Sequence, residues 1–354
     1  KWRKFANSLR LRLALRLRYV DKQMAIDNMS DLQEADLILS REDDANMFTS
    51  TDNQDNNNSN YVRVLNSGSS LTKRGIGQEI VNNMINKNDP RIKIWADTAK
   101  AEFPKDDPDL DYFGYRGTPL LGLVPVENKY PWGLESASRI SDLWYVQVIE
   151  IPVLRSSEMY FALAESVLFG LRSGDAQGYY KKGMEEALNW AKEFYDTSKP
   201  QLPDVLERLY PDWSEADIEL LLTHKELTQG EIDTFLATPA AVLSGSPEEQ
   251  LEQIIVQKNI GLYPQEYQNW AEWRRTGYPI VQVGPDDDDL KGESPRRMPW
   301  PNVEQTVNGD NYAEAETRIS GGDLRLSKVW WDANPNVPYY NPDPVPWMAT
   351  PWVQ

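Results

Sequence analysis

The stretch SEMYFALAESVLFGLRSGDAQGYYKKGMEEAL, residues 157–188, carries the clearest structural signal of the chain, because it has the pattern of two helices joined by a short turn. The turn contains Asp175, and small residues such as Ala164 and Ala176 stand beside Tyr180, as in tetratricopeptide-like helical hairpins. A similar helix, turn and helix occurs at 5–35, around VDKQMA, so the chain has a weak internal repeat. The pattern indicates a mainly helical protein.

Outward from this hairpin, further segments have helical patterns. The N-terminal LRLRLALRLR is ambiguous, since its period of two usually indicates a strand, whereas a helix would place Leu9, Leu13 and Leu17 on one face. Residues 43–75 and the chain after Trp300 are predicted to be irregular. Three later segments begin with capping boxes, in which a hydroxyl and a carboxylate three residues on satisfy free N–H groups: Ser214 with Asp217, Thr228 with Glu231, and Ser246 with Glu249.

The aromatic and charged segment NWAEWRRTGYP, residues 269–279, could grip a ligand or end a helix. A helix explains its residues better, because Gly277 permits a left-handed cap. Arg274 and Arg275 then suit the negative end of the helix dipole. Glu272 could pair with either arginine or with a neighbouring helix. We therefore interpret this segment as the end of a helix.

Composition excludes several function classes. The 354 residues carry a formal net charge of −18, which argues against a protein that binds nucleic-acid phosphates. Cysteine is absent and His224 is the single histidine, so a thiolate site or a histidine-rich metal site is close to excluded. No stretch approaches the roughly 18 consecutive apolar residues of a membrane span. The unusual feature is the aromatic content, with 13 Trp and 17 Tyr.

The region 103–151 is rich in Pro, Gly, Tyr and Trp and has little periodicity, so we predict a loop-rich region on the ligand side of the protein. Flat aromatic rings stack on the apolar faces of sugars, and Asn and Arg can bond hydroxyls. The same aromatic residues could instead form a small core beneath a long loop. The candidate ligand-binding residues are Tyr112, Tyr115, Arg116, Asn128 and Trp132, with Asp43 and Asn46 as weaker candidates.

Six motifs occur in order along the chain: FANSLRLRLALRL, NDPRI, SEMYFALAESVLFG with GDAQGYYKKGMEEAL, QKNIGLYPQEYQNWAEWRRTGYP, PRRMPWP and GGDLRLSKVWWD. Together they strongly resemble the motifs of the SusD/RagB-like outer-membrane nutrient-binding lipoproteins. The resemblance spans Phe5 to Asp332 and implies an all-α fold of tetratricopeptide-like helical hairpins with a large irregular loop-rich subdomain. It also resolves LRLRLALRLR as helix.

The resemblance further implies a cell-surface lipoprotein that captures an oligomeric nutrient and acts as the lid of a SusC-type TonB-dependent transporter. An oligosaccharide ligand is favoured over an oligopeptide, the ligand of a RagB-like protein. The resemblance implies no catalytic residue and no cofactor. The family's lipidated cysteine and first helices should lie upstream, so we expect the chain to be a fragment that lacks its N-terminus and the lipid anchor.

We treat residues 1–354 as a single SusD-like domain with two elaborations of unassigned role. These are an acidic helical insertion at 201–250 and a Pro-rich extended tail at 335–354. A structural helical-repeat adaptor is a less favoured function for the same fold.

A glycan-cleaving enzyme is another alternative, because Glu158 and Glu165 lie seven residues apart on one helical face. Their side chains could just reach the separation that an inverting glycosidase needs. Packing already accounts for that helix, so we expect no catalysis there. The acidic stretches 105–114 and 284–293 could hold calcium, although neither fits a helix-loop-helix calcium site. We interpret His224 as an ordinary surface or half-buried side chain.

Overall fold

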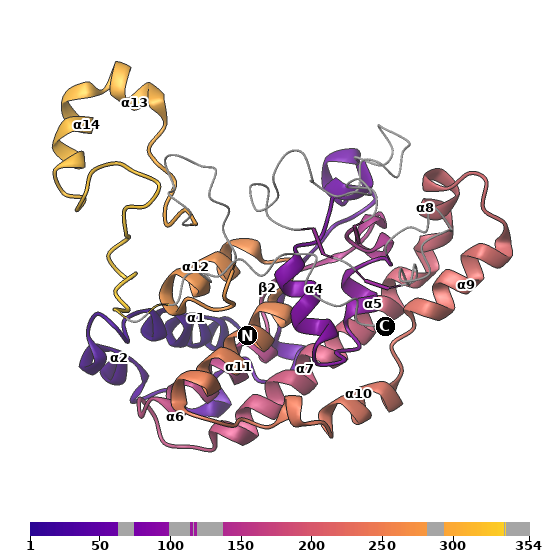
Figure 1. The fold of residues 1–354 in the computed structure, drawn as a ribbon, viewed down its shortest axis with the longest axis horizontal. Helices are drawn as coiled ribbons and strands as arrows, with labels where there is room; N and C mark the ends of the chain where they lie inside the picture. The colour runs from indigo at the N-terminus through magenta and orange to yellow at the C-terminus, as the bar shows by residue number, and fades with distance from the viewer. Residues whose placement is uncertain are drawn as a thin grey trace, which may run out of the picture.

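The computed structural model describes residues 1–62, 74–98, 114–115, 117–118, 137–281, 294–335 and 337, and most of these are helical (Figure 1). The predicted helical fold is thereby confirmed. The helices are α1 Trp2–Arg16, α2 Lys22–Met29, α4 Gln78–Ile85, α5 Ile92–Trp95, α6 Ser156–Leu168, α7 Ala176–Ser198, α8 Leu202–Leu209, α9 Glu215–Lys225, α10 Gln229–Leu236, α11 Pro247–Leu262, α12 Glu266–Thr276, α13 Asn302–Val307 and α14 Gly309–Glu316.

Two helical hairpins, α6–α7 and α1–α2, form the frame that the repeat predicted. Asp175 caps α7 by accepting a hydrogen bond from the backbone N–H of Gly178 at 3.0 Å, which explains the Asp in the turn. Helix α6 packs between α7, α11 and α1, so it lies at the centre of the body. The N-terminal LRLRLALRLR is helical, and it buries Leu11 and Leu15 while Leu13 is 46% exposed.

An aromatic cluster forms the middle of the main core. Trp144 stacks on Phe194 with ring centroids 4.2 Å apart. Trp190 also stacks on Phe194, with ring centroids 5.2 Å apart. Trp95 lies 5.5 Å from Trp144, and Tyr263 completes the cluster. Three of the thirteen tryptophans therefore serve packing in this cluster, where each ring buries a large apolar surface.

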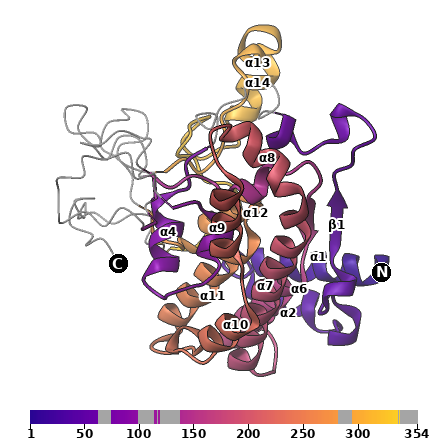
Figure 2. The same ribbon diagram turned by 90° about the vertical axis from the view of Figure 1, so that its right-hand side faces the viewer.

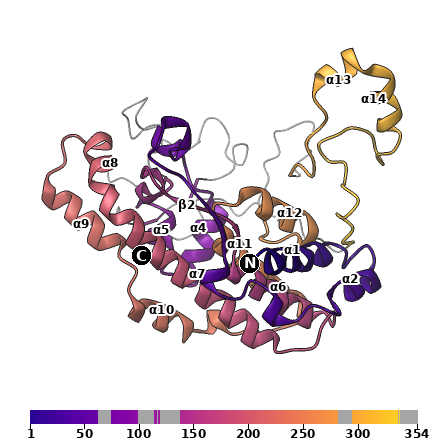
Figure 3. The same ribbon diagram turned by 180° about the vertical axis from the view of Figure 1, so that it is seen from behind.

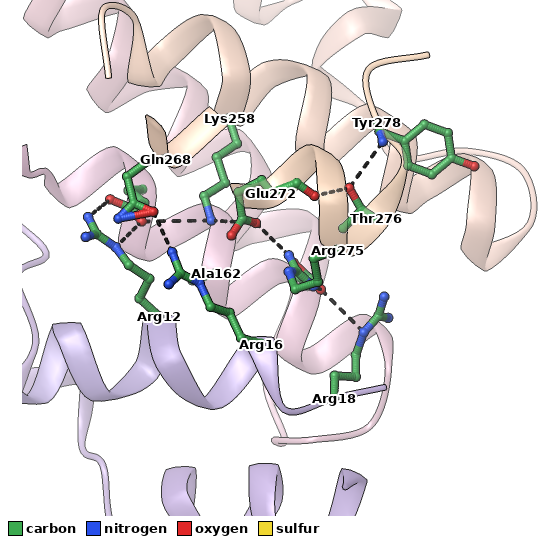
Figure 4. Close-up of polar contacts among 12 residues, drawn as sticks. Arg12, Arg16, Arg18, Ala162, Lys258, Gln268, Glu272, Arg275, Thr276 and Tyr278 are labelled. Carbon is green, nitrogen blue, oxygen red and sulfur yellow. Dashed lines mark hydrogen bonds and ion pairs between the residues drawn. The ribbon is translucent and has the colours of Figure 1, made fainter. Parts of the chain in front are cut away.

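Buried ion pairs join α1, α6, α11 and α12 (Figure 4). Arg12 of α1 binds Glu158 of α6 through two nitrogens, at 2.7 and 2.5 Å. Lys258 of α11 lies 3.9 Å from Glu158 and 3.1 Å from Glu272 of α12. Buried charges are tolerated when each has a partner of opposite charge. Each of these buried charges has such a partner, and the pairs connect four helices.

The segment 269–279 ends helix α12 as predicted. Gly277 has a φ of 84° and caps the helix by donating its N–H to the Trp273 carbonyl at 2.7 Å. Glu272 pairs both with Arg275, at 2.6 Å, and with Lys258 of the neighbouring helix. In the view from behind, α12 lies directly against α1 (Figure 3), where Arg16 donates to Gln268 at 2.7 Å. These side chains anchor α12 within the body.

The prediction of an irregular segment at 43–75 is wrong in part. Strand β1, Ala45–Phe48, pairs antiparallel with β2, Glu150–Leu154, so that Met47 lies opposite Ile151. The local sequence could not reveal β1, because its pairing partner is about one hundred residues away. Short 3₁₀ turns flank these strands: Glu34–Asp36, Arg41–Asp43, Gln54–Asn56 and Asp142–Tyr145.

Helices α8, α9 and α10 occupy the acidic segment 201–250. They pack on the main core through Leu206 of α8, Leu221 of α9, and Ile232 and Phe235 of α10. All three predicted capping boxes form, at the first residues of α9, α10 and α11. Two 3₁₀ turns, Lys199–Gln201 and Pro239–Ala241, connect these helices to their neighbours.

The prediction of an irregular chain after Trp300 is also wrong in part, since α13 and α14 form there. The two helices stand clear of the helical body (Figure 2), and neither has a buried residue. Asp323 holds them, because its carboxylate accepts bonds from the N–H of Trp300 at 3.1 Å and from the hydroxyl of Tyr312 at 3.1 Å, and pairs with Arg297. This organisation depends on one buried carboxylate rather than on apolar periodicity.

In the part of the chain that the structure describes, no helix is both long and apolar enough to cross a bilayer.

Candidate functional site

Of the predicted ligand-side region 103–151, residues 137–151 lie in the body, where Leu143, Trp144 and Tyr145 are buried. Backbone contacts hold together the two ends of the 99–136 segment, next to Thr98 and Ala137. The N–H of Asp97 donates to the Arg139 carbonyl at 2.9 Å, and Ala96 forms an antiparallel bridge with Ile140. The N–H of Ile76 donates to the Ser138 carbonyl at 3.2 Å. The 99–136 segment therefore starts and ends on one fixed base.

Lys225, at the C-terminal end of α9, binds residues at both ends of the 99–136 segment. Its side chain is 1% exposed, and its Nζ donates to Oδ1 of Asp97 at 2.6 Å and to the hydroxyl of Ser141 at 2.8 Å. The carbonyl of Ala96 lies 3.5 Å away. One buried ammonium thus binds the residues on both sides of the 99–136 segment, with its three protons directed at oxygen acceptors.

Within the segment, Thr118 is tied to the chain before α4. Its N–H donates to the Ile76 carbonyl at 2.7 Å, and its own carbonyl accepts from the N–H of Gln78 at 2.9 Å. A Cβ on the adjacent Gly117 would lie 2.1 Å from Cα of Gln78, so only glycine fits this close backbone approach.

Tyr115 is held by His224, the residue before Lys225 on α9. The phenol oxygen lies 2.8 Å from Nε2 of His224, the ring centroids are 6.2 Å apart, and the ring planes differ by 20°. The phenol oxygen and Nε2 each lie in the plane of their own ring. A hydrogen bond of 2.8 Å between them, with ring centroids as far apart as 6.2 Å, means that the two rings meet edge to edge rather than face to face. Tyr115 is half-buried against the core, and His224 is exposed.

The protonation states of this pair follow from its surroundings. Burial, with Asp97 nearby, raises the pKa of Tyr115, so the phenol keeps its proton. His224 is exposed as a residue, but neighbouring atoms cover part of its imidazole, and this partial desolvation lowers its pKa. The ammonium groups of Lys225 and Lys93 lower the pKa further, and Asp97 opposes the shift by a smaller amount. At neutral pH the phenol therefore donates its proton to a neutral imidazole, whose own proton is on Nδ1.

The structure brings only one predicted site residue into this arrangement. Tyr112, Arg116, Asn128 and Trp132 lie outside the described residues, and their assignment as ligand contacts stays a prediction. Of the set, Tyr115 is described, and its hydroxyl is engaged by His224.

The two weaker candidates lie beside α1 and β2, away from α9. The carboxylate of Asp43 pairs with Lys4 of α1 at 2.5 Å, and this hydrogen bond lowers the pKa of Asp43. Asn46 lies in β1, opposite Pro152 of β2. Their described contacts are thus with the frame of the body rather than with Tyr115.

Glu158 and Glu165, the pair considered for glycan cleavage, are buried and each is bound by an arginine. Burial alone would raise the pKa of Glu165, but Arg275 and Arg18 lower it overall, so the carboxylate stays ionised. A general acid needs a raised pKa and access to the glycosidic oxygen, and Glu165 has neither.

The acidic stretches considered for calcium lie almost entirely outside the described residues. In the ranges that the structure describes, no group of three or more Asp, Glu or His side chains could hold a metal ion.

Sequence reasoning missed His224 and Lys225 as parts of this site. Their contacts reach Tyr115, more than a hundred residues earlier in the chain, and Asp97, at a similar separation. The sequence shows only that the chain's single histidine stands next to a lysine near the end of a predicted helix. Such a pair is common on protein surfaces, so it does not indicate a binding site. Only the fold shows which side chains they meet.

Three solved structures share this fold. A chitin-binding protein has a TM-score of 0.68 and 25% sequence identity, with 94% of this chain and 65% of that protein covered. A SusD homologue from Bacteroides fragilis NCTC 9343 has a TM-score of 0.69 and 22% identity, with coverages of 94% and 67%. A chitin-binding SusD homologue from Flavobacterium johnsoniae has a TM-score of 0.64 and 23% identity, with coverages of 96% and 64%. This chain spans about two thirds of the length of these structures.

No curated protein matches the chain. Residues 1–301 match the model of the SusD-like family, which is described as starch-binding and associating with the outer membrane.

Proposed function

This chain belongs to the SusD-like family, and we propose that it captures an oligosaccharide at the bacterial cell surface. The bound nutrient then passes to a SusC-type TonB-dependent transporter, over which this protein acts as a lid. A lipid anchor at the N-terminus of the whole protein attaches it to the outer membrane. The observation that carries the proposal is the family match over residues 1–301, which include the helical hairpins and the base of the 99–136 segment.

A glycan is the favoured class of ligand. Two of the structures with this fold are described as chitin-binding, and the family description names starch. The 99–136 segment is rich in aromatic residues; Lys225 fixes its base, and His224 holds Tyr115 within it. The formal net charge of −18 favours a neutral sugar over an acidic one.

The proposed role requires binding and release but no chemical step. The buried, arginine-bound state of Glu158 and Glu165 supports a binding protein over a hydrolase. We therefore expect no turnover of oligosaccharides.

Isothermal titration calorimetry against chitohexaose, maltohexaose, cellohexaose and a mixed tryptic peptide digest tests the proposed ligand class. We expect saturable binding of at least one oligosaccharide and recovery of that ligand intact after prolonged incubation. Saturable binding of peptides alone would replace the glycan with the oligopeptide of a RagB-like protein. Appearance of shortened products would establish a hydrolase instead.

The proposed partner is tested separately, by affinity purification of the tagged full-length protein from native outer membranes. A large TonB-dependent receptor should co-purify in a stoichiometric amount, and an unrelated tagged surface lipoprotein should recover none. Isolation of the protein without such a receptor would overturn the lid assignment and leave the ligand class to the calorimetry.

A further inference from the structure

The edge-to-edge arrangement of Tyr115 and His224 creates a flat aromatic surface that is two rings wide. The planes differ by only 20°, and a hydrogen bond joins the edges of the two rings. Tyr115 is half-buried and His224 is exposed, so together they would offer a longer aromatic face than either ring alone.

The surface is supported from behind. Tyr115 packs against the main core, and the neighbour of His224, Lys225, is buried and bonded to Asp97 and Ser141. The backbone that carries His224 is thus fixed at the end of α9, while the imidazole itself is exposed. A rigid backing of this kind lowers the entropic cost of ordering a binding surface.

We propose that Tyr115 and His224 form one sugar-stacking subsite, in which the apolar C–H face of a neutral pyranose lies across both rings. This subsite rests on the proposed glycan-binding function and adds His224, a residue of the acidic 201–250 segment, to the ligand contacts. The role of α9 is then to bring an aromatic ring to the side of the 99–136 segment and to hold the base of that segment.

The surroundings of the pair favour a neutral sugar ring. Among the residues that the structure describes, the ammonium groups that lower the pKa of His224 are those of Lys225 and Lys93, and each is paired with a carboxylate, Asp97 and Glu231 respectively. The phenol and Nε2 are hydrogen-bonded to one another, so these two polar atoms are already engaged, and a ligand at this pair would contact the rings through their apolar faces. Flat aromatic faces of this type bind the apolar side of a sugar.

The single histidine makes the proposal directly measurable. In protein labelled with ¹³C-histidine, His224 gives the one Cε1–H ring signal. The three oligosaccharides and the peptide digest of the calorimetry panel are titrated into this protein. An oligosaccharide that binds by calorimetry should shift this signal in a saturable way with the same dissociation constant. Calorimetric binding that leaves the His224 signal unchanged would overturn the subsite and leave the proposed function standing.

Absence of binding by every oligosaccharide in the panel would reject the proposed glycan function, and the sugar subsite with it.

Two variants separate ligand contact from folding. His224→Ala removes an exposed ring, so the melting temperature should change little, while oligosaccharide affinity falls about three- to tenfold. Tyr267→Ala is the matched control, because this aromatic side chain is 79% exposed on α12, far along the chain from the pair, and its affinity should equal that of the native protein. Equal affinities for native protein and His224→Ala would contradict the proposal.

His224→Phe completes the series, since it keeps a flat ring but cannot accept the hydrogen bond from Tyr115. Affinity should recover to within about threefold of the native value if stacking is the main contribution. A loss as large as that of His224→Ala would mean that the hydrogen bond, rather than the second ring, maintains the site, and would overturn the two-ring surface.

Discussion

Arg275 and Glu165 face each other across two parallel hydrogen bonds, of 2.5 and 2.8 Å, although 110 residues separate them in the chain. Both side chains are buried, and the pair joins α12 to α6. Arg275 also binds Glu272, and Arg18 approaches Glu165 at 3.5 Å (Figure 4). The charged residues of the segment 269–279 thus act inside the protein, where they determine how α12 lies on the central hairpin.

Replacement of Glu165 by Gln should destabilise the protein strongly, because it leaves Arg275 and Arg18 buried with too little negative charge. Breaking a buried ion pair of this kind costs about 3–5 kcal/mol in the free energy of unfolding. Urea denaturation followed by circular dichroism measures the change. The control is Glu185→Gln, the same substitution at a solvent-exposed pair with Lys182, which should cost less than about 1 kcal/mol. Similar unfolding midpoints for the two variants would contradict this interpretation.

Asp44 should contribute a stability that decreases as the pH rises. Burial raises the pKa of its carboxyl to about 6, and the N–H of Ser156, 2.7 Å away, and Arg41 offset this effect only in part. A carboxyl with a raised pKa binds its proton more tightly in the folded state, so its contribution is complete below the unfolded pKa near 3.8 and is lost as the pH rises through about 6.

The test compares the native protein with Asp44→Asn by urea unfolding between pH 4 and 7.5. The stability of the native protein relative to the variant should fall by about 2–3 kcal/mol across this range. Asp43→Asn is the control, because a hydrogen bond from Lys4 lowers the pKa of Asp43 and places its titration below this range. A difference between native protein and Asp44→Asn that is constant with pH would refute the assignment.

Gly277→Ala should destabilise the end of α12, because its φ of 84° is a left-handed conformation that an alanine adopts at a cost of about 1–2 kcal/mol. Gly230→Ala is a matched control within α10, where an added Cβ meets no atom within 4 Å. That second change should be neutral or stabilise by up to about 1 kcal/mol, since alanine favours helix. Thermal unfolding of both variants measures the contrast, and equal losses would show that the cap is not needed.

Trp132→Ala should weaken oligosaccharide binding about tenfold if the 99–136 segment carries the ligand, because one stacked aromatic ring contributes roughly 1 kcal/mol or more. Calorimetry with the tightest-binding oligosaccharide measures the change. Trp2→Ala removes an equally large ring that is 84% exposed on α1, and it should leave the affinity unaltered. Native affinity in Trp132→Ala would move the ligand site away from this segment.

Features set by neighbouring residues could be predicted from the sequence. The capping boxes at Ser214, Thr228 and Ser246, and the glycine cap at Gly277, each depend on residues within one helical turn, and all of them form. The strand β1 could not be predicted, because its partner β2 follows about one hundred residues later.

The candidate site illustrates the same limit. An aromatic residue in a sequence can face a ligand or a core, and composition does not distinguish the two. Trp95, Trp144 and Trp190 turn out to share one buried cluster, whereas Tyr115 packs at the edge of the core and meets His224. The contribution of α9 was invisible for this reason, since its end approaches Tyr115 only when the chain is folded.

The bonds from Lys225 to Asp97 and Ser141 have an evolutionary consequence. Both ends of the 99–136 segment are joined at one buried ammonium, and Tyr115, Gly117 and Thr118 fix its middle. The packing of the helices therefore does not depend on the lengths of the two stretches between these fixed points, and doubling the length of such a closed loop costs only about 0.6 kcal/mol of loop-closure entropy. Residues could be inserted, deleted or exchanged in these two stretches while the body keeps its packing, so a new nutrient could be adopted by changing them and leaving the rest of the protein intact.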